Sequence, residues 1–179
     1  MKPICLLLRL TNEEVMLMKY FVQYVVAILL LVTSTFFTWY EGSAVREDPW
    51  EWKYTAYFSK MLNGEVTSSA DISQLDHFLY AAKFTPLYPT LLVICISYIL
   101  ILTGWLLFRR NPNVQIMFHM VTGILYFVCS EMVSDSPTLG GKSFTITFLA
   151  IGLIHFVLAT LFYIISRKEK GHRQHLNGV

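Results

Sequence analysis

Four long apolar runs alternate with polar connections along the chain, and this pattern predicts four helices that cross a membrane. Each run is close to the roughly 20 residues that a helix needs to span the hydrocarbon core. We expect the transmembrane helices at 19–40, 87–108, 114–133 and 144–166. The connections are then an extracellular loop, a cytoplasmic turn, a second extracellular loop and a basic cytoplasmic tail, at 41–86, 109–113, 134–143 and 167–179. The expected fold class is all-α, a polytopic membrane protein with a helical outer loop.

The first extracellular loop carries the signals of two short amphipathic helices, which we expect at about 49–62 and 72–84. Asp48 is a candidate N-cap, and Pro49 and Glu51 follow it at the positions that favour a helix start and a capping box. Asp71 with Gln74 three residues later is a second candidate cap. In the first helix the apolar positions share one face: Trp50, Tyr54, Tyr57, Phe58, Met61 and Leu62.

The aromatic residues of this loop predict an element at the membrane interface. Trp and Tyr combine an apolar body with a polar tip, and an amphipathic helix tethered between two spans tends to lie at headgroup level. The alternative is a surface that binds a ligand or partner, because aromatic side chains also anchor protein interfaces. The candidate residues for such a contact are Trp50, Trp52, Tyr54, Tyr57 and Phe58.

Composition and charge agree with a membrane protein and indicate its orientation. Hydrophobic residues make up 55% of the 179 residues and charged residues 15%, whereas about a quarter of the residues in soluble domains are charged. If both termini are cytoplasmic, nine of the 14 Lys and Arg residues lie inside, but only three of the 12 Asp and Glu residues. This asymmetry follows the positive-inside rule. The basic tail is typical of a segment attracted to anionic lipid, not of a nucleic-acid site.

The segment 1–18 precedes the first apolar run, and its own apolar stretch is too short to span. Our hypothesis is that translation starts at Met18, because Glu13, Glu14 and Val15 can be encoded by a purine-rich, bacterial type of ribosome-binding sequence. A cytoplasmic N-terminal segment that begins at Met1 is the alternative. We expect the first span to be an uncleaved anchor, since its apolar run is longer than a usual signal-peptide core.

Polar residues within the spans are candidates for function because they are costly in hydrocarbon. The candidates are His119, Tyr126, Glu131 and His155. The histidines belong to polar and small stripes that should face other helices, formed by His119, Thr122, Gly123, Tyr126 and Ser130 and by Thr145, Gly152, His155, Ala159 and Tyr163. Counted from the inner ends of the spans at about 1.5 Å per residue, His119 and His155 lie about 8 and 16 Å deep. We therefore expect no shared metal.

Motifs for other chemistry are absent from the sequence. The outer loop has no cysteine, which excludes a disulfide-stapled ectodomain, and no cysteine or histidine spacing indicates a metal or another cofactor. No nucleophile elbow, paired-carboxylate motif or dinucleotide fingerprint occurs, which favours a non-enzymatic protein. The stretch LGGKS at 139–143 lacks the first glycine of a phosphate-binding loop. We interpret its two glycines as a turn before the fourth span.

A resemblance to known proteins rests on the run WYEGSA followed by DPWEWKYTAYFSK, within 39–60. This run resembles a segment of small uncharacterised integral membrane proteins of Bacillus-type bacteria. The resemblance covers the first span, the outer loop and part of the second span. It implies a bacterial plasma-membrane location, and it implies no activity.

Three classes of function fit these patterns. The leading one is a non-enzymatic four-span protein of the bacterial plasma membrane, whose outer loop contacts lipid, envelope material or a partner. The expected partners are the lipid bilayer and either another membrane protein or further copies of the chain, and no nucleic acid. The alternatives are a small transport or permeation subunit and a membrane redox protein that uses haem or quinone.

Overall fold

The computed structural model describes residues 2–177, with the side chains of 14–169 and 171. All regular elements in this part of the chain are helical, which confirms the all-α class. Four helices are long and apolar enough to cross a membrane, as expected. They are α1 (Lys2–Gly42), α5 (Leu87–Phe108), α6 (Pro112–Ser134) and α7 (Leu139–Asn177).

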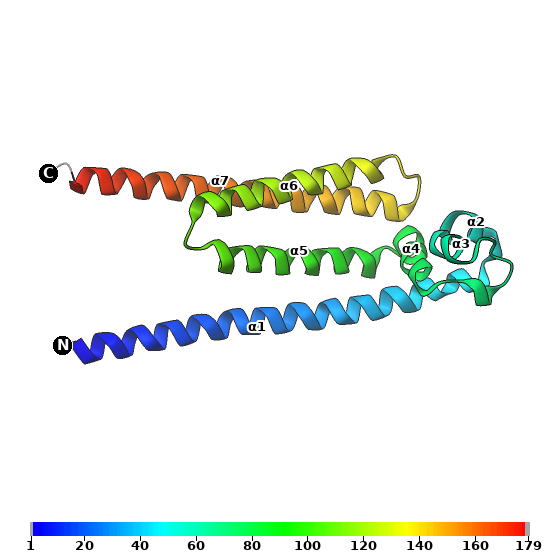
Figure 1. Ribbon diagram of the computed structural model, residues 1–179, viewed down its shortest axis with the longest axis horizontal. Coiled ribbons are helices and arrows are strands. Elements are labelled where there is room, and N and C mark those ends of the chain that lie inside the picture. Colours follow the sequence, from blue (N-terminus) through cyan, green and yellow to red (C-terminus); the bar gives the residue numbers. More distant parts are fainter. Residues whose placement is uncertain (1, 178–179) are drawn as a thin grey trace.

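The long helices lie side by side in two pairs, α1 with α5 and α6 with α7, and the short elements gather at one end (Figure 1). We call residues 43–86 the loop domain. Its elements are η1 (Ser43–Glu47), η2 (Pro49–Glu51), α2 (Trp52–Thr55), α3 (Tyr57–Asn63), η3 (Ser69–Asp71) and α4 (Gln74–Phe84). Helix α4 contacts α1, α5 and α7 near their ends, so the loop domain is seated on the bundle.

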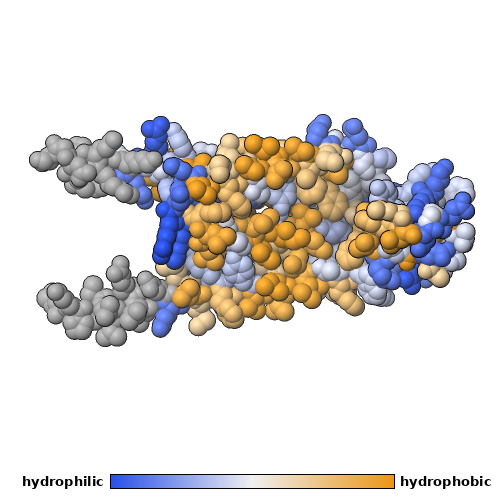
Figure 2. Space-filling view, in the orientation of Figure 1, coloured by the Kyte–Doolittle hydropathy of each residue, from blue (hydrophilic) through white to orange (hydrophobic). Residues whose placement is uncertain are grey.

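Much of the surface of the long helices is apolar. Figure 2 shows hydrophobic residues over the middle of the bundle and hydrophilic residues at its two ends and on the loop domain. Helix α1 illustrates the pattern, because Phe21, Leu29 and Val32 are each more than 60% exposed. Such a surface is far larger than the apolar patches of soluble monomers, and it is compatible with a membrane protein.

Helices α6 and α7 pack closely through small residues. A Cβ atom on Gly152 would lie 3.3 Å from the carbonyl oxygen of Gly123, so both glycines are needed for the observed approach. Ser130 Oγ donates to the Thr145 carbonyl at 3.0 Å, and Ala159 is buried. The two predicted stripes therefore face each other over most of their length. Tyr163 departs from the pattern because it is 48% exposed.

The first helix expected in the loop, at 49–62, is not continuous. The structure divides it into η2, α2 and α3, with a break at Ala56, whose backbone leaves the helical region (φ −81°, ψ 53°). The break buries Ala56 completely and frees the N–H groups of the next turn for another partner. Asp48 precedes η2 but makes no capping hydrogen bond with its side chain, so the predicted capping box is wrong.

The second loop helix begins at Gln74 instead of 72, and its cap is Ser73, whose Oγ accepts from the Leu75 N–H at 3.3 Å. Asp71 instead closes the turn before it. Its carboxylate accepts from the backbone N–H groups of Ser68 at 2.9 Å and Thr67 at 3.1 Å. These hydrogen bonds, from Ser68 first, lower the pKa of the Asp71 carboxyl below its usual value.

The glycine pair before the fourth span also departs from its interpretation as a turn. Gly140 and Gly141 lie within the first turns of α7, which begins at Leu139. The physical reason is a close approach, because a Cβ atom on Gly140 would lie 1.7 Å from the Ala82 carbonyl oxygen of α4. At its other end α7 continues as a helix beyond 166 to Asn177, through most of the basic tail.

Candidate functional sites in the loop domain and between the long helices

The loop domain has a small core of its own. Val45, Ala56 and Ile72 are buried together, and Trp52, Val66 and Tyr80 pack around them. Trp52 also donates its indole N–H to the Val45 carbonyl at 2.7 Å. Trp52 is therefore a half-buried core residue, although the sequence had suggested a contact surface for it. Burial raises the pKa of the Tyr80 phenol, which agrees with its place at this core.

Asp76 holds the two halves of the loop domain together. Its side chain is fully buried in α4, and its carboxylate accepts from the N–H groups of Phe58 and Ser59, each at 2.8 Å. It also accepts from the Ser59 hydroxyl, which in turn accepts from the Ser73 N–H at 2.7 Å. The carboxylate thus caps α3 from another helix, where a negative charge is favourable. Sequence spacing did not reveal this cap, because 17 residues separate the partners.

The next residue, His77, is buried without such partners. Its ring is 1% exposed, neither ring nitrogen makes a hydrogen bond, and the Trp39 ring centroid lies 5.8 Å away. The pKa of His77 is lowered, first by burial and then by the Arg46 charge, while the Trp39 backbone and the Asp76 carboxylate oppose this more weakly. His77 is therefore held in its neutral form at neutral pH.

The loop domain exposes five large apolar side chains. Trp50 is 84% exposed, Tyr54 65% and Tyr57 66%. Met61 and Leu62 follow in α3 at 76% and 71%. We call these five residues the aromatic face. Exposed groups of this size mark contacts with membranes or with other proteins.

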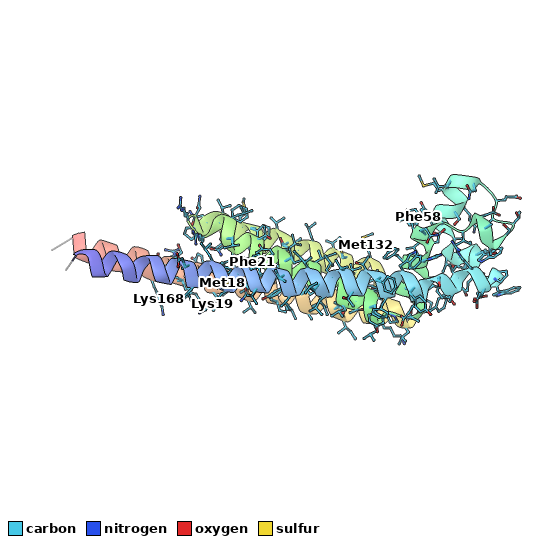
Figure 3. The ribbon with its side chains drawn as sticks, turned by 90° about the horizontal axis from the view of Figure 1, so that it is seen from below. Met18, Lys19, Phe21, Phe58, Met132 and Lys168 are labelled. Carbon is cyan, nitrogen blue, oxygen red and sulfur yellow. The ribbon has the colours of Figure 1, made fainter. Side chains whose placement is uncertain are left out.

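Two lysines lie beside Tyr54 of the aromatic face. The ammonium groups of Lys53 and Lys83 lie 5.5 and 5.4 Å from the Tyr54 ring centroid. Lys83 also pairs with Glu51 at 2.7 Å, which is the one ion pair that occurs among the described side chains. Phe58, a predicted surface residue, is only partly exposed and lies in the loop domain just beyond the ends of the long helices (Figure 3).

The histidines of α6 and α7 meet, which corrects the expectation that they lie at different depths. His119 and His155 are 1% and 0% exposed, and their Nδ1 atoms are 3.0 Å apart. The expectation failed because it counted from the inner ends of the spans. Counted from the α6–α7 connection, His119 lies 15 residues before Ser134 and His155 lies 16 residues after Leu139, so their depths match.

Further polar groups lie next to this pair. The Tyr126 ring stacks against His155 at 5.8 Å, and the Tyr126 hydroxyl shares a hydrogen bond with Ser97 of α5. Glu131, the fourth candidate, is exposed near the end of α6 and does not join the pair. Among the described residues, no three His, Cys, Asp or Glu side chains gather closely enough to hold a metal.

The helices that carry the loop domain are also the part of the chain that matches known proteins. The family described as Domain of unknown function (DUF4306) matches residues 21–108. The Uncharacterized protein YjdJ of Bacillus subtilis (strain 168) is 42% identical over 79 residues, which are 43% of this chain and 72% of that relative. The chain belongs to this family. This confirms the resemblance to an uncharacterised Bacillus-type family. No solved structure matches the chain significantly.

The match divides the molecule at a structural boundary. Residues 21–108 contain about half of α1, the whole loop domain and α5, and the match ends with α5 at Phe108. Helices α6 and α7 lie outside it. Because 79 residues are 72% of the relative, the relative is only about 110 residues long. The family match therefore covers the loop domain and the helices on either side of it, and α6 and α7 lie outside the matched residues.

Proposed function

We propose that this protein is a non-enzymatic, four-span protein of the bacterial plasma membrane with both termini in the cytoplasm. In this proposal the loop domain lies on the outer surface, and its aromatic face contacts the headgroup region of the outer leaflet. The observation that carries the proposal is the aromatic face itself, five large exposed side chains on a domain with its own core. No reaction is assigned to the protein.

The connections of the loop domain support contact with lipid. The 3₁₀ helix η1 follows directly on α1 at Gly42, and only Thr85 and Pro86 separate α4 from α5. The domain is therefore tethered closely at both ends and stays near the ends of the spans. Trp and Tyr side chains with nearby lysines are the residues that favour the membrane interface.

The charge distribution supports the orientation. The loop domain is on the acidic side of the chain, and the basic residues of the α5–α6 turn and of the α7 tail lie at the other end of the bundle. Both the start of α1 and the end of α7 lie at this basic end (Figure 1). The positive-inside rule then places these two ends in the cytoplasm.

The contact is testable with a spin label at Met61, in a variant whose three native cysteines are replaced by alanine. Met61→Cys should be more accessible to membrane-soluble oxygen than to a water-soluble nickel chelate when the protein is in lipid bilayers. Glu65→Cys, on an exposed position outside the aromatic face, is the matched control and should show the opposite preference. A water-exposed label at Met61 would refute the proposal. Immobilisation at Met61 only in native membranes, with a crosslink to a second protein, would indicate a protein partner.

A second candidate, a small permeation subunit, has one observation in its favour. The fully buried His119–His155 pair and the Tyr126–Ser97 hydrogen bond form a polar region between three apolar helices. In a membrane, such residues mark ion and proton pathways. Proton flux into proteoliposomes should then depend on His155, and flux equal to that of protein-free liposomes would eliminate this candidate.

A further inference from the structure

Two hollows lie between the long helices and share two lining residues. The larger, of about 710 Å³, lies between α5 and α7 near the loop domain, and it reaches Glu41 at the end of α1. The smaller, of about 390 Å³, lies between α1 and α5. Both are lined by Leu91 and Ile94 of α5. The two hollows therefore adjoin along α5, and we call them together the α5 groove. The volume of each hollow is within the range of natural ligand sites.

The lining of the α5 groove changes from polar to apolar along its length. Near the loop domain it includes the Glu41 carboxylate and the Thr90 hydroxyl, which is buried without a hydrogen-bond partner. Farther along, between α1 and α5, it is mostly aliphatic, with Val26, Ala27 and Leu30 on the α1 side. A ligand that fits this lining has a polar head and a hydrocarbon tail.

The charged end of the groove selects a cation. Glu41 is the one charged residue among the described side chains that line the larger hollow, and it forms no ion pair with any of them. It also lies in the last turn of α1, which has no basic residue. A helix C-terminus carries a partial negative charge from its unpaired carbonyl groups, and this charge adds to that of the carboxylate.

We propose that the α5 groove binds one outer-leaflet phospholipid whose headgroup carries a primary amine. The amine pairs with Glu41, and one acyl chain lies along Leu91 and Ile94 into the hollow between α1 and α5. This inference rests on the membrane placement in the proposed function, and it concerns a different surface from the aromatic face.

The near part of the groove has the length of a lipid of one leaflet. Leu30 and Val26 lie 11 and 15 residues before Glu41 in α1, which corresponds to about 17 and 23 Å along the helix axis. Half of the hydrocarbon core is about 15 Å thick. Val22, at the far end of the smaller hollow, lies 19 residues before Glu41, or about 29 Å along the axis, so a lipid with its headgroup at Glu41 fills the larger hollow and only the near part of the smaller one, around Leu30. The wall that α7 contributes, from Leu139 to Thr147, lies outside the residues matched by the family.

The test measures bound lipid on the full chain, purified in mild detergent after exchange into equal amounts of phosphatidylethanolamine and phosphatidylglycerol. Native mass spectrometry should show about one retained lipid per chain, with at least tenfold more of the amine lipid. Ile94 lines both hollows, so Ile94→Trp places a larger side chain in them and should remove the retained lipid. Ile96→Trp, on the same helix and similarly exposed, is the matched control and should retain it. Equal lipid retention by the two variants would overturn the proposal.

A second variant tests the headgroup separately. Glu41→Gln keeps the shape of the site but removes its charge, so the retained lipid should lose its tenfold amine preference. Replacement of phosphatidylethanolamine by phosphatidylcholine distinguishes a primary amine from any positive headgroup, and we expect the choline lipid to be retained less. An unchanged amine preference in Glu41→Gln, or equal retention of the choline lipid, would contradict the assignment. The Ile96→Trp variant reports on insertion and folding. A failure of the membrane placement would therefore show in that variant, whereas the lipid preferences above concern the groove alone.

Discussion

Asp76 and His77 are consecutive buried residues in α4 with opposite hydrogen-bonding situations. The Asp76 carboxylate accepts three hydrogen bonds from α3, and the imidazole of His77 has none. A buried charge is tolerated only where donors compensate for lost hydration, whereas a buried histidine can become neutral instead. The stability of the loop domain should therefore depend on both residues, for different reasons.

Asp76→Asn should destabilise the loop domain. The amide has only one acceptor oxygen, so at least one N–H group at the start of α3 loses its partner, and its NH₂ group faces a donor. Hydrogen bonds to buried charged groups contribute about 1.5–3 kcal/mol each, and we expect a loss of that size in the free energy of unfolding. Urea unfolding followed by tryptophan fluorescence can measure it, because Trp52 lies in the core. Glu65→Gln, an exposed change of the same kind, should have almost no effect.

His77 should make the loop domain less stable in acid. Its pKa in the folded protein lies below the ordinary value of 6.5, so the unfolded chain binds a proton more readily than the folded one. The stability contributed by neutral His77 is fully present above about pH 6.5 and is lost as the pH falls below it. The melting temperature should therefore fall between about pH 7 and pH 5. His77→Phe should show a smaller fall, and an identical pH profile in this variant would contradict the assignment.

At the scale of elements, the α6–α7 hairpin is organised around its histidine pair. One Nδ1 carries a proton and donates it in a hydrogen bond, and the other Nδ1 accepts this hydrogen bond. Gly123 and Gly152 allow the close approach that brings the rings together. The hairpin therefore combines small residues with an interhelical hydrogen bond, two devices that stabilise helix pairs in membranes.

The histidine pair should show energetic coupling in a double-mutant cycle. His119→Leu and His155→Leu should each destabilise the protein, and together they should cost less than the sum, by about 0.6–2 kcal/mol. Unfolding in mixed micelles of dodecyl sulfate provides the measurement. A control cycle pairs His119→Leu with Thr160→Val, whose hydroxyl bonds only within α7, to Phe156. Coupling as small as in the control would show that the histidines only fill space.

At the scale of the whole molecule, the proposed topology places the loop domain and the α7 tail on opposite sides of the membrane. In a variant without native cysteines, Glu65→Cys should react with a membrane-impermeant maleimide on intact cells. Lys168→Cys, at the other end of the bundle (Figure 3), should react only after the cells are made permeable. Labelling of Lys168→Cys on intact cells would overturn the orientation.

The sequence predicted the long helices well because their signal is local. An apolar run of 22 residues such as 87–108 forms α5 with the expected bounds, since length and composition suffice to indicate such a helix. The loop was predicted less well. Its apolar periodicity indicated one helix at 49–62, but the Asp76 carboxylate competes for the N–H groups of Phe58 and Ser59, and the helix is interrupted before them.

The family match and the structure together describe a molecule of two parts. The two-helix unit that carries the loop domain contains the residues matched by the family, and the α6–α7 hairpin lies outside them. The parts meet where Gly140 of α7 approaches α4 and where Tyr126 bonds to Ser97. The larger hollow of the α5 groove lies along the same junction, so this part of the groove depends on the presence of the hairpin.

The amino-acid sequence alone determined the helical class, the number of long apolar helices and the charge asymmetry between their ends, because each depends on neighbouring residues or on simple counts. Tertiary structure alone decided which polar residues are paired. The Asp76 cap and the contact between His119 and His155 join positions that are far apart in the chain. The unpaired state of His77 depends on its complete burial. Such contacts follow from how helices pack and where their connections end, and no local pattern encodes that geometry.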